Sequence, residues 1–246
     1  MATRLETADD FAATLAEVEL LLRESDEAAP GGPREDERRA AVLNKAALLL
    51  MTGKFEAFLE TAAEDFLFAV NQVGGATRFI PPRMLAEHSV KAVAGIDLKL
   101  SGGDIAGVSA IFAGLAKMWG NVDPCSDLAI ACKFNYGKHG ESEVIKLFKR
   151  FGIDDVFAQV PVVDDATERY EGQAPPLVDV KGMVNSLTGI RNNILHQDES
   201  PSLTSDGLRK QIATLHKFAV ELVKALQSIV DQIDTRVQAE GAANAR

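Results

Sequence analysis

Residues 35–73 constrain the fold most strongly, because they contain no proline and one glycine, and their apolar residues return every three, four or seven positions. The repeating residues are Leu48, Phe55, Leu59, Ala62, Phe66, Val70 and Val73. Nothing in this stretch interrupts a helix, and the spacing places the apolar side chains on one face. The stretch therefore predicts a long helix in the core of the protein.

The other patterned stretches also have helical spacing, and none shows the period of two that is typical of a β-strand. Shorter helices are expected at about residues 84–99, 105–119 and 142–151, followed by an acidic, mostly irregular connection over 156–176. Two strongly patterned helices close the domain. Their apolar residues are Val180, Met183, Leu187, Ile190 and Ile194 in the first, and Leu208, Ile212, Leu215, Leu222, Leu226, Ile229 and Ile233 in the second. The sequence predicts an all-α protein.

Residues 1–33 are expected to form an N-terminal helical arm and linker. Thr7 is placed to cap the helix, with Asp10 three residues further on. The helix carries one narrow apolar stripe, which must pack against another surface and consists of Phe11, Leu15, Val18 and Leu22. Prolines and paired glycines at 30–33 end the helix. Residues 34–236 then form the main domain, and the small, polar tail 237–246 is expected to fray.

Composition excludes several classes of protein. No apolar run approaches the roughly 20 residues that cross a bilayer, and the polar N-terminus is unlike a secretory signal, so a cytoplasmic protein without a membrane contact is expected. Cys125 and Cys132 lack the spacing of a zinc site, and no metal or cofactor is expected. Of the formal charge of −10, −6 lies in the first 40 residues, which hold 11 acids and 5 bases. This charge disfavours general coating of nucleic acid but permits a local site.

The end of the penultimate helix carries the strongest candidates for a functional site. On an ideal helical wheel, we take Ile194 as the centre of the buried face. Arg191 lies about 60° from that centre. Asn192 and His196 lie about 160° from it, measured in opposite directions around the helix, so the two are stacked at i and i+4 on the outer face. His196 therefore points away from its own core. An arginine, an amide and an imidazole in one small region can together bind an anion and exchange a proton.

At these residues the sequence resembles the HEPN superfamily. The run from Arg191 to His196, Arg-Asn-Asn-Ile-Leu-His, is similar to the Arg-x4-6-His motif of that superfamily, in which a polar residue, commonly Asn, follows the arginine. The order of elements is also similar: a long helix containing residues 48–58, then 147–153, then the motif helix and a long closing helix. The resemblance covers about residues 40–233 and is greatest to the bacterial defence and toxin branch, including the RiboL-PSP-associated type. It implies an antiparallel helical bundle of HEPN type with an additional N-terminal helix.

The resemblance implies a metal-independent endoribonuclease that acts as a homodimer, with two copies of the motif facing each other. His196 would serve as general base or acid for the 2′-hydroxyl and the leaving 5′-oxygen. Arg191 would hold the scissile phosphate, and Asn192 would orient the phosphate or the imidazole. The RNA product would end in a 2′,3′-cyclic phosphate. Such a protein would act as a toxin or anti-phage defence effector, with an antitoxin or defence-system protein as its partner.

Asp198 departs from one pattern of the superfamily. In a subset of HEPN toxins the motif continues His-x-Tyr, and a partner nucleotidyltransferase modifies that tyrosine. Asp198 occupies the corresponding position here, so this mode of silencing is not expected. Its negative charge near the proposed phosphate site has two alternative effects: it raises the pKa of His196, or it weakens RNA binding.

The most basic stretch of the main domain, residues 133–150, is the candidate surface for binding RNA. Its basic residues and histidine are Lys133, Lys138, His139, Lys146, Lys149 and Arg150. Phe134 and Tyr136 are interleaved with them, and Glu141 and Glu143 are the acids of the stretch. Two interpretations stand side by side: a wall that follows the phosphates beside the dimer cleft, or the solvated face of an amphipathic helix.

Three functions fit the sequence. The leading one is the HEPN-type ribonuclease. The second is a catalytically silent HEPN module that binds nucleotide or a partner protein, which the acidic net charge and the lack of another catalytic group favour. The third is a helical scaffold whose acidic arm docks on a neighbour and whose motif is coincidental.

Overall fold

The computed structural model describes residues 3–28, 34–75, 77–120, 127–134, 140–164, 176–197 and 202–244. Within these ranges the chain is helical, apart from loops and one isolated bridge between Val163 and Leu177. The all-α prediction is confirmed. Among the described residues, no helix is both long and apolar enough to cross a membrane.

The helices account for every patterned stretch of the sequence. In chain order they are α1 (Thr7–Glu27), α2 (Arg34–Val73), α3 (Pro82–Val93), α4 (Ile96–Ser101), α5 (Ile105–Trp119), α6 (Glu141–Lys149), α7 (Val156–Gln159), α8 (Val180–Gln197) and α9 (Ser205–Asn244), with a 3-10 turn at Thr77–Phe79. The short helix α7 lies in the segment that the sequence predicts to be mostly irregular. It forms because Asp155 caps it, accepting hydrogen bonds from the backbone of Phe157 and Ala158.

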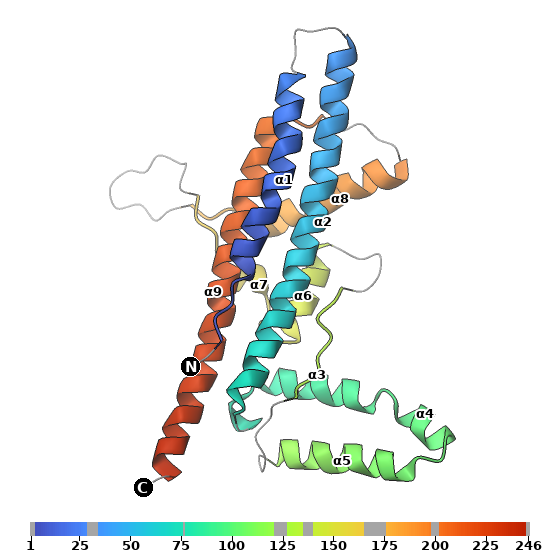
Figure 1. Cartoon of the computed structure of the whole chain (residues 1–246), viewed down its shortest axis with the longest axis vertical. Coiled ribbons are helices and arrows are strands. Elements are labelled where there is room, and N and C mark those ends of the chain that lie inside the picture. The colour runs from blue at the N-terminus through green and yellow to red at the C-terminus, as the bar shows by residue number, and fades with distance from the viewer. Residues whose placement is uncertain are drawn as a thin grey trace.

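Helices α1, α2 and α9 lie side by side and form the long body of the molecule (Figure 1). The apolar stripe of α1 is buried in this body, and the ring of Phe11 stacks on Phe58 of α2 with 4.7 Å between the centroids. Burying one such side chain stabilises the fold by about 1.5–3 kcal/mol. The α1 stripe therefore finds its partner within the same chain, and α1 shares one core with α2 and α9.

The beginning of α1 differs in detail from the prediction, and the beginning of α9 shows a local cap instead. Thr7 does not cap α1; it is the first helical residue, and its hydroxyl donates a hydrogen bond to Asp65 of α2. The hydroxyl of Thr204, directly before α9, accepts a hydrogen bond from the backbone of Gly207 at 3.1 Å. Threonine is a favoured capping residue, so the start of α9 is fixed locally, whereas the start of α1 is fixed by a contact with another helix.

Helix α9 is longer than predicted. It continues to Asn244, whereas the small, polar tail is expected to fray. Val237 packs against the core over Gly75, where any side chain would collide with it. Glu240, about one turn later, forms an ion pair with Arg78 in the 3-10 turn. These tertiary contacts hold the end of α9 against the body, which local sequence does not show.

Helices α6 and α8 cover another side of the body. Helix α6 packs on α2, α7 and α8, and α8 packs on α2 and α9. The first half of α8 is buried through Val180, Val184 and Leu187, whereas its last turns project from the body (Figure 1). The C-terminal end of α8 therefore lies at an exposed edge of the molecule.

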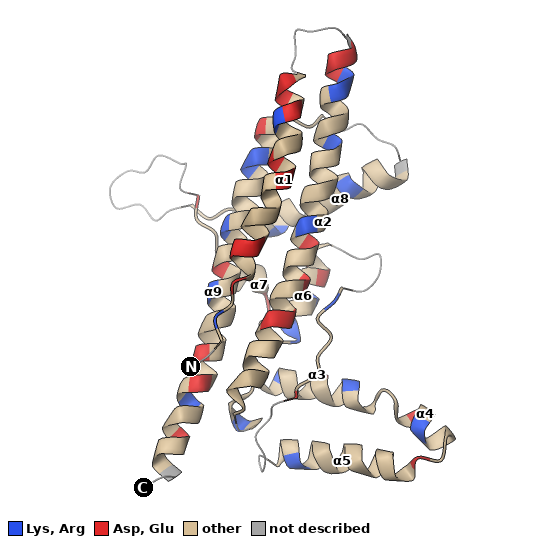
Figure 2. Cartoon of the chain, viewed as in Figure 1, with Lys and Arg blue, Asp and Glu red and all other residues tan. Residues whose placement is uncertain are grey.

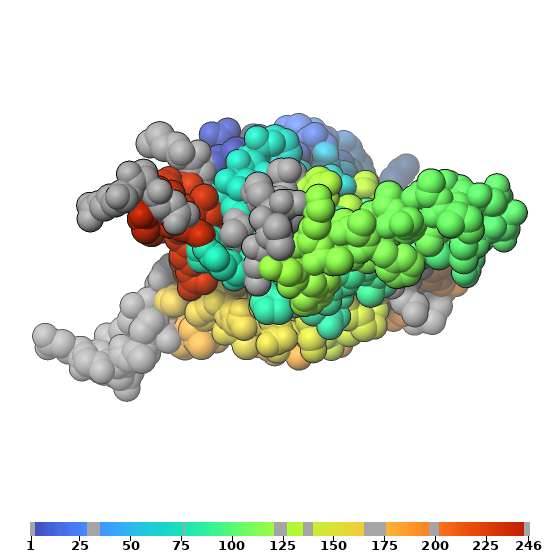
Figure 3. Space-filling view, turned by 90° about the horizontal axis from the view of Figure 1, so that it is seen from below, coloured from blue at the N-terminus to red at the C-terminus, as the bar shows by residue number. Residues whose placement is uncertain are grey.

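Residues 82–119 form a projecting hairpin of α3, α4 and α5, which we call the α3–α5 hairpin (Figures 1 and 3). The sequence predicts one helix over about 84–99, but a two-residue turn at 94–95 divides it into α3 and α4. Helix α5 then folds back against α3 and α4. The indole of Trp119 donates a hydrogen bond to the hydroxyl of Ser89 at 2.9 Å, which ties the end of α5 to α3.

Candidate functional site on helix α8

Helix α8 presents its polar residues much as the helical wheel predicts. Ile190 and Ile194 are partly buried and pack against the core, whereas Asn192 and His196 are exposed. The helix carries no aspartate or glutamate between residues 180 and 197, although the chain as a whole is strongly acidic. The helix itself therefore adds no negative charge to this surface, although Asp179 and Asp198 flank it in the sequence.

Arg191 lies at the boundary between the buried and exposed faces and binds a partner on another helix. Its Nη1 donates a hydrogen bond to Oε1 of Glu56, at 2.8 Å. Glu56 belongs to α2, and the two side chains are 19% and 20% exposed. Because this pair is mostly shielded from water, its interaction is stronger than that of an ordinary surface ion pair.

Glu56 has an unusual electrostatic environment. Burial raises its pKa to about 7; the positive charge of Arg191 opposes this rise, and the nearby Glu60 carboxylate adds to it. Glu56 also lines a cavity of about 10 Å³ beside α8, together with Thr188 and Phe134. A cavity of this size holds about one water molecule at most, so little water solvates the carboxylate from that side. The charge of Glu56 is therefore easily lost near neutral pH.

Within one protomer, Arg191 and His196 do not converge on a single point. They are five residues apart on a regular helix, which separates them by about 7.5 Å along the axis and about 140° around it. Asn192 and His196 are four residues apart and share one side of the helix. The structure thus brings Arg191 to Glu56, and Asn192 to the side of His196, but leaves the arginine and the histidine on different sides.

The basic stretch lies beside α8, and several of its residues have partners within the protein. The start of α6 is close to α8, since Gly140 faces the side-chain oxygen of Asn185. Lys146 forms an ion pair with Glu143 at 2.6 Å, and Lys133 forms one with Glu64 at 3.7 Å. Both lysines remain well exposed, so these pairs leave their charges available to an anion.

Arg150 has a different role from the lysines. Its Nη1 donates hydrogen bonds to the backbone carbonyls of Ala131 and Lys133, at 2.7 and 3.4 Å. It therefore holds the loop at 127–134 against α6. Lys149 is exposed at the end of α6. Lys138, His139 and Asp198 lie outside the described residues.

Glu56 is the site residue that the analysis of the sequence missed. It lies one turn after Thr52 and one turn before Leu59, and both of these side chains are buried. A carboxylate on the buried side of a long helix is a local signal of an unusual environment. Its partner Arg191 is 135 residues away in the sequence, so the pair itself is visible only in the structure.

The described residues show no group of three or more histidine, cysteine, aspartate or glutamate side chains arranged to hold a metal ion. Cys132 is buried, and burial raises the pKa of its thiol to about 11, so this thiol is unreactive. Cys125 lies outside the described residues. The candidate groups at the end of α8 and on α2 are Arg191, Asn192, His196 and Glu56.

The all-α bundle, with an arginine and an exposed histidine at the end of a late helix, agrees with what the resemblance to the HEPN superfamily predicts. The family model described as RiboL-PSP-HEPN matches residues 10–232. This protein belongs to that family. No curated protein and no solved structure matches the chain. The matched region begins inside α1, so α1 falls within the span of the family. HEPN domains commonly act on RNA and dimerise.

Proposed function

We propose that this protein is a metal-independent endoribonuclease that acts as a homodimer in the cytoplasm, as a toxin or anti-phage defence effector. One observation carries the proposal: Arg191 of the family motif is held by a carboxylate whose pKa is close to 7, and the exposed His196 follows on the same helix. An anion-binding group and a proton-transferring group are the two requirements of RNA cleavage by the 2′-hydroxyl.

In the proposed reaction the 2′-oxygen attacks phosphorus and the bond from phosphorus to the 5′-oxygen breaks. The imidazole of one copy of His196 accepts the proton of the 2′-hydroxyl, and the protonated imidazole of the second copy donates a proton to the leaving 5′-oxygen. The products are a 2′,3′-cyclic phosphate and a 5′-hydroxyl. Arg191 neutralises the charge that develops on the phosphate, and Asn192 orients the phosphate or the imidazole.

Glu56 acts in this proposal as a positioning residue. In the free protein it holds the guanidinium of Arg191 in one orientation. When a phosphate replaces Glu56 as the partner of Arg191, Glu56 stays near the site and must not repel the phosphate. A carboxyl group with a pKa of about 7 meets this need, because taking up a proton then requires little free energy at neutral pH.

The RNA would reach the site along α8, which carries no acidic residue of its own, and along the lysines beside it. We propose that Lys133, Lys138, His139, Lys146 and Lys149 contact the phosphates, and that Arg150 supports this surface by holding Lys133 and its loop in place. Contacts of this kind make binding sensitive to salt but not to base sequence.

The test is RNA cleavage by purified protein in the presence of a metal chelator. His196→Ala is expected to lower the initial rate by about 100-fold or more, since that is the usual contribution of a general acid or base. His216→Ala is the matched control, because His216 lies on α9 and outside the motif. The product ends are checked for a cyclic phosphate. Equal cleavage by wild type and His196→Ala, with folding confirmed by circular dichroism, would overturn the proposal.

A second function is favoured by the Arg191–Glu56 pair, which covers the guanidinium within one protomer. In this alternative the protein is a catalytically silent HEPN module that binds nucleotide or a partner protein such as an antitoxin. The two functions are separated by incubating high concentrations of wild-type protein with total RNA without metal. Absence of cleavage, together with nucleotide binding measured by calorimetry, would favour the silent module.

A further inference from the structure

A hollow of about 180 Å³ lies between the start of α3 and the second half of α9. Arg78 of the 3-10 turn and Arg236 of α9 line it, together with Gln232 one turn before Arg236, and we call it the two-arginine hollow. No aspartate or glutamate lines it in the described part of the chain, although the whole chain carries a charge of −10. Two guanidinium groups and an amide that share one hollow are groups that bind an anion.

Arg236 has a charge that no acid of the described ranges neutralises by direct contact. Its side chain is exposed and forms no ion pair or hydrogen bond with another described residue. Glu240 lies one turn after Arg236 on α9, a spacing that allows an ion pair, but it pairs with Arg78 instead. The N–H donors of the Arg236 side chain are therefore available to a ligand.

Arg78 is held at the hollow by two contacts. Its guanidinium lies over the ring of Phe79, 5.1 Å from the ring centroid, and this contact fixes its orientation. Its ion pair with Glu240 is partly open to water, since the two side chains are 46% and 30% exposed, and such pairs contribute little free energy. Glu240 is not among the residues that line the hollow. An anion in the hollow can therefore replace Glu240 as the partner of Arg78.

The walls of the hollow strengthen its attraction for an anion. Ile80 and Ile233 line it and are 2% and 3% exposed, so part of the wall belongs to the apolar core, where charges interact more strongly than in water. Helix α3 also begins at the hollow, with Pro82 as its first residue, and the N-terminus of a helix is its positive end.

The two-arginine hollow lies far from the most acidic part of the chain. Aspartate and glutamate are concentrated where α1 ends and α2 begins (Figure 2). Helix α2 has 40 residues and spans about 60 Å, and the hollow lies beyond its opposite end. Interactions between exposed charges are largely screened beyond about 8 Å at physiological ionic strength. The acidity of the chain therefore does not oppose an anion at this place.

We propose that the two-arginine hollow binds a phosphate group, with Arg78 and Arg236 as its charged ligands and Gln232 as a third donor. The amide of Gln232 donates one N–H to Ser228 at 3.3 Å and has a second to offer. Two guanidinium groups and an amide match the three or four oxygens and the double charge of a phosphate better than the two oxygens of a carboxylate. The volume holds several water molecules, so a phosphate group fits.

This site is separate from the family motif at the end of α8, and it stands whether or not the chain cleaves RNA. The phosphate has two possible sources, a small phosphorylated molecule or the backbone of a nucleic acid. Both present the same tetrahedral anion to the hollow, and the part of the ligand beyond the phosphate would lie outside it.

The first test is an NMR titration of the full chain with inorganic phosphate, in which chloride keeps the ionic strength constant. The arginine Nε–H signals of the wild type are expected to report one saturable site, with a dissociation constant on the order of 1 mM. Arg236→Gln is expected to raise this constant by about 10-fold or more, because a charged hydrogen-bond donor is lost. Arg83→Gln is the matched control, since Arg83 is 53% exposed, pairs with Glu87 and does not line the hollow.

A second variant is expected to bind more tightly. Glu240→Gln removes the carboxylate that competes for Arg78, so the dissociation constant for phosphate should fall by about 3-fold or more. A gain of binding cannot come from misfolding, so this variant tests the site independently of Arg236→Gln. Acetate, a carboxylate, should bind the wild type at least about 10-fold more weakly than phosphate.

The third test identifies the source of the phosphate. The wild type and Arg236→Gln are titrated with adenosine monophosphate, which carries a terminal phosphate, and with a single-stranded DNA of ten nucleotides that has hydroxyl ends. Binding of the monophosphate alone, lost in Arg236→Gln, supports a site for a small phosphorylated molecule. Binding of the DNA that Arg236→Gln weakens supports a site for the backbone of a nucleic acid.

Three results would each overturn the proposed site. They are the absence of saturable phosphate binding by the wild type, equal binding by Arg236→Gln and the wild type, and equal binding of acetate and phosphate. Because no RNA cleavage is measured, these results leave the proposed ribonuclease untouched, and loss of the ribonuclease would leave the phosphate site untouched.

Discussion

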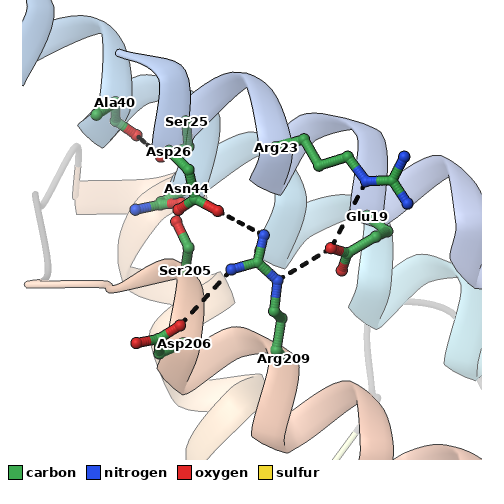
Figure 4. Close-up of polar contacts among 9 residues, drawn as sticks. All are labelled: Glu19, Arg23, Ser25, Asp26, Ala40, Asn44, Ser205, Asp206 and Arg209. Carbon is green, nitrogen blue, oxygen red and sulfur yellow. Dashed lines mark hydrogen bonds and ion pairs between the residues drawn. The ribbon is translucent and has the colours of Figure 1, made fainter. Parts of the chain in front are cut away.

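Arg191 and Arg209 each join a late helix to an early one, but their surroundings differ. Arg209 of α9 contacts three acids: Nε binds Glu19 at 3.0 Å, Nη2 binds Asp26 at 2.6 Å, and Nη1 lies 3.6 Å from Asp206 (Figure 4). Arg191 of α8 forms its ion pair in the described residues with one acid, Glu56. Arg209 is 30% exposed and Arg191 is 19% exposed.

The acidic partners of the two arginines are shifted in opposite directions. The hydrogen bond from Arg209, followed by that from Ser205, lowers the pKa of Asp26 below its usual value. Burial raises the pKa of Glu56 to about 7 despite the charge of Arg191. An arginine that contacts three acids, one of which has a lowered pKa, has little capacity for a further anion. An arginine whose partner is easily protonated can exchange that partner for a phosphate, which is why we assign function to Arg191 and structure to Arg209.

Replacing each arginine by alanine is expected to give the largest difference between the two sites. Arg191→Ala should lower the rate of metal-free RNA cleavage by about 100-fold or more, because the charge that stabilises the transition state is lost. Arg209→Ala should leave the rate within a few-fold of wild type. Initial rates on a labelled RNA check both expectations. Arg191→Lys, which keeps the charge but not the planar fork, should fall between them. Equal effects of Arg191→Ala and Arg209→Ala would contradict the comparison.

The pH dependence of stability is expected to reveal Glu56. In the folded state the pKa of Glu56 is about 7, above the unfolded value near 4.5, so the folded protein loses stability as the pH rises through this interval. Glu56→Gln removes this loss and keeps an oxygen that accepts a hydrogen bond from Arg191. Relative to wild type, the variant should gain about 2 kcal/mol between pH 5 and pH 8, a discounted conversion of the shift because part of the side chain is exposed.

Urea unfolding at pH 5 and pH 8 measures this gain. Glu17→Gln is a suitable control, because Glu17 is 59% exposed in its ion pair with Lys54 and its substitution should change stability little. If the stability difference between Glu56→Gln and wild type were the same at both pH values, the raised pKa would be refuted.

The sequence predicts the helices well, because the apolar residues that each helix buries repeat at a regular local spacing. Most of the predicted residues of the core are buried, and Leu48, Phe66 and Leu215 are fully buried, whereas others such as Ile190 and Ile194 are partly buried and pack against the core. The wheel also places Arg191 correctly at the boundary of α8. It does not identify Glu56 as the partner of Arg191, or Glu19 and Asp26 as partners of Arg209, because these acids lie 135, 190 and 183 residues from their arginines in the sequence. Contacts between residues so far apart in the sequence depend on how whole helices pack against one another.

Periodicity also does not show whether an apolar helix is covered. The apolar residues of α1 and of α5 both have helical spacing, yet α1 is buried in the body and α5 is largely exposed on the hairpin. The difference arises from the path of the chain after α2: α3 already runs outward from the long helices, and α4 and α5 complete the hairpin beside it (Figure 1). The exposure of α5 therefore follows from the path of the chain and could not be predicted from composition.

Replacing Arg209 is expected to change the free energy of unfolding by less than the change expected for Glu56→Gln. Arg209→Ala leaves Glu19 and Asp26 facing each other without a cation between them, so their repulsion adds to the lost ion pairs. The network is partly exposed, which limits the effect to about 1 kcal/mol. Thermal unfolding should show a melting temperature lower by about 2–4 °C, with a smaller difference in 1 M salt. Arg23→Ala is the control, because Arg23 lies 4.0 Å from Glu19 and its side chain is 68% exposed. A loss that salt does not reduce would indicate packing rather than charge.

The smallest expected effect concerns Asp26, whose pKa is lowered in the folded state. Such a group stabilises the protein at pH values above its unfolded pKa, and this stabilisation is lost as the pH falls through the folded pKa. Asp26→Asn should therefore be less stable than wild type by a few tenths of a kcal/mol at pH 7, and the difference should shrink as the pH falls below the unfolded pKa of Asp26. In an Arg209→Ala background the same substitution should be neutral or stabilising, because it then removes repulsion with Glu19. A double-mutant cycle at pH 7 measures the coupling. No coupling would show that Arg209 is not the cause of the shift, and the contrast with Glu56 would then lose its basis.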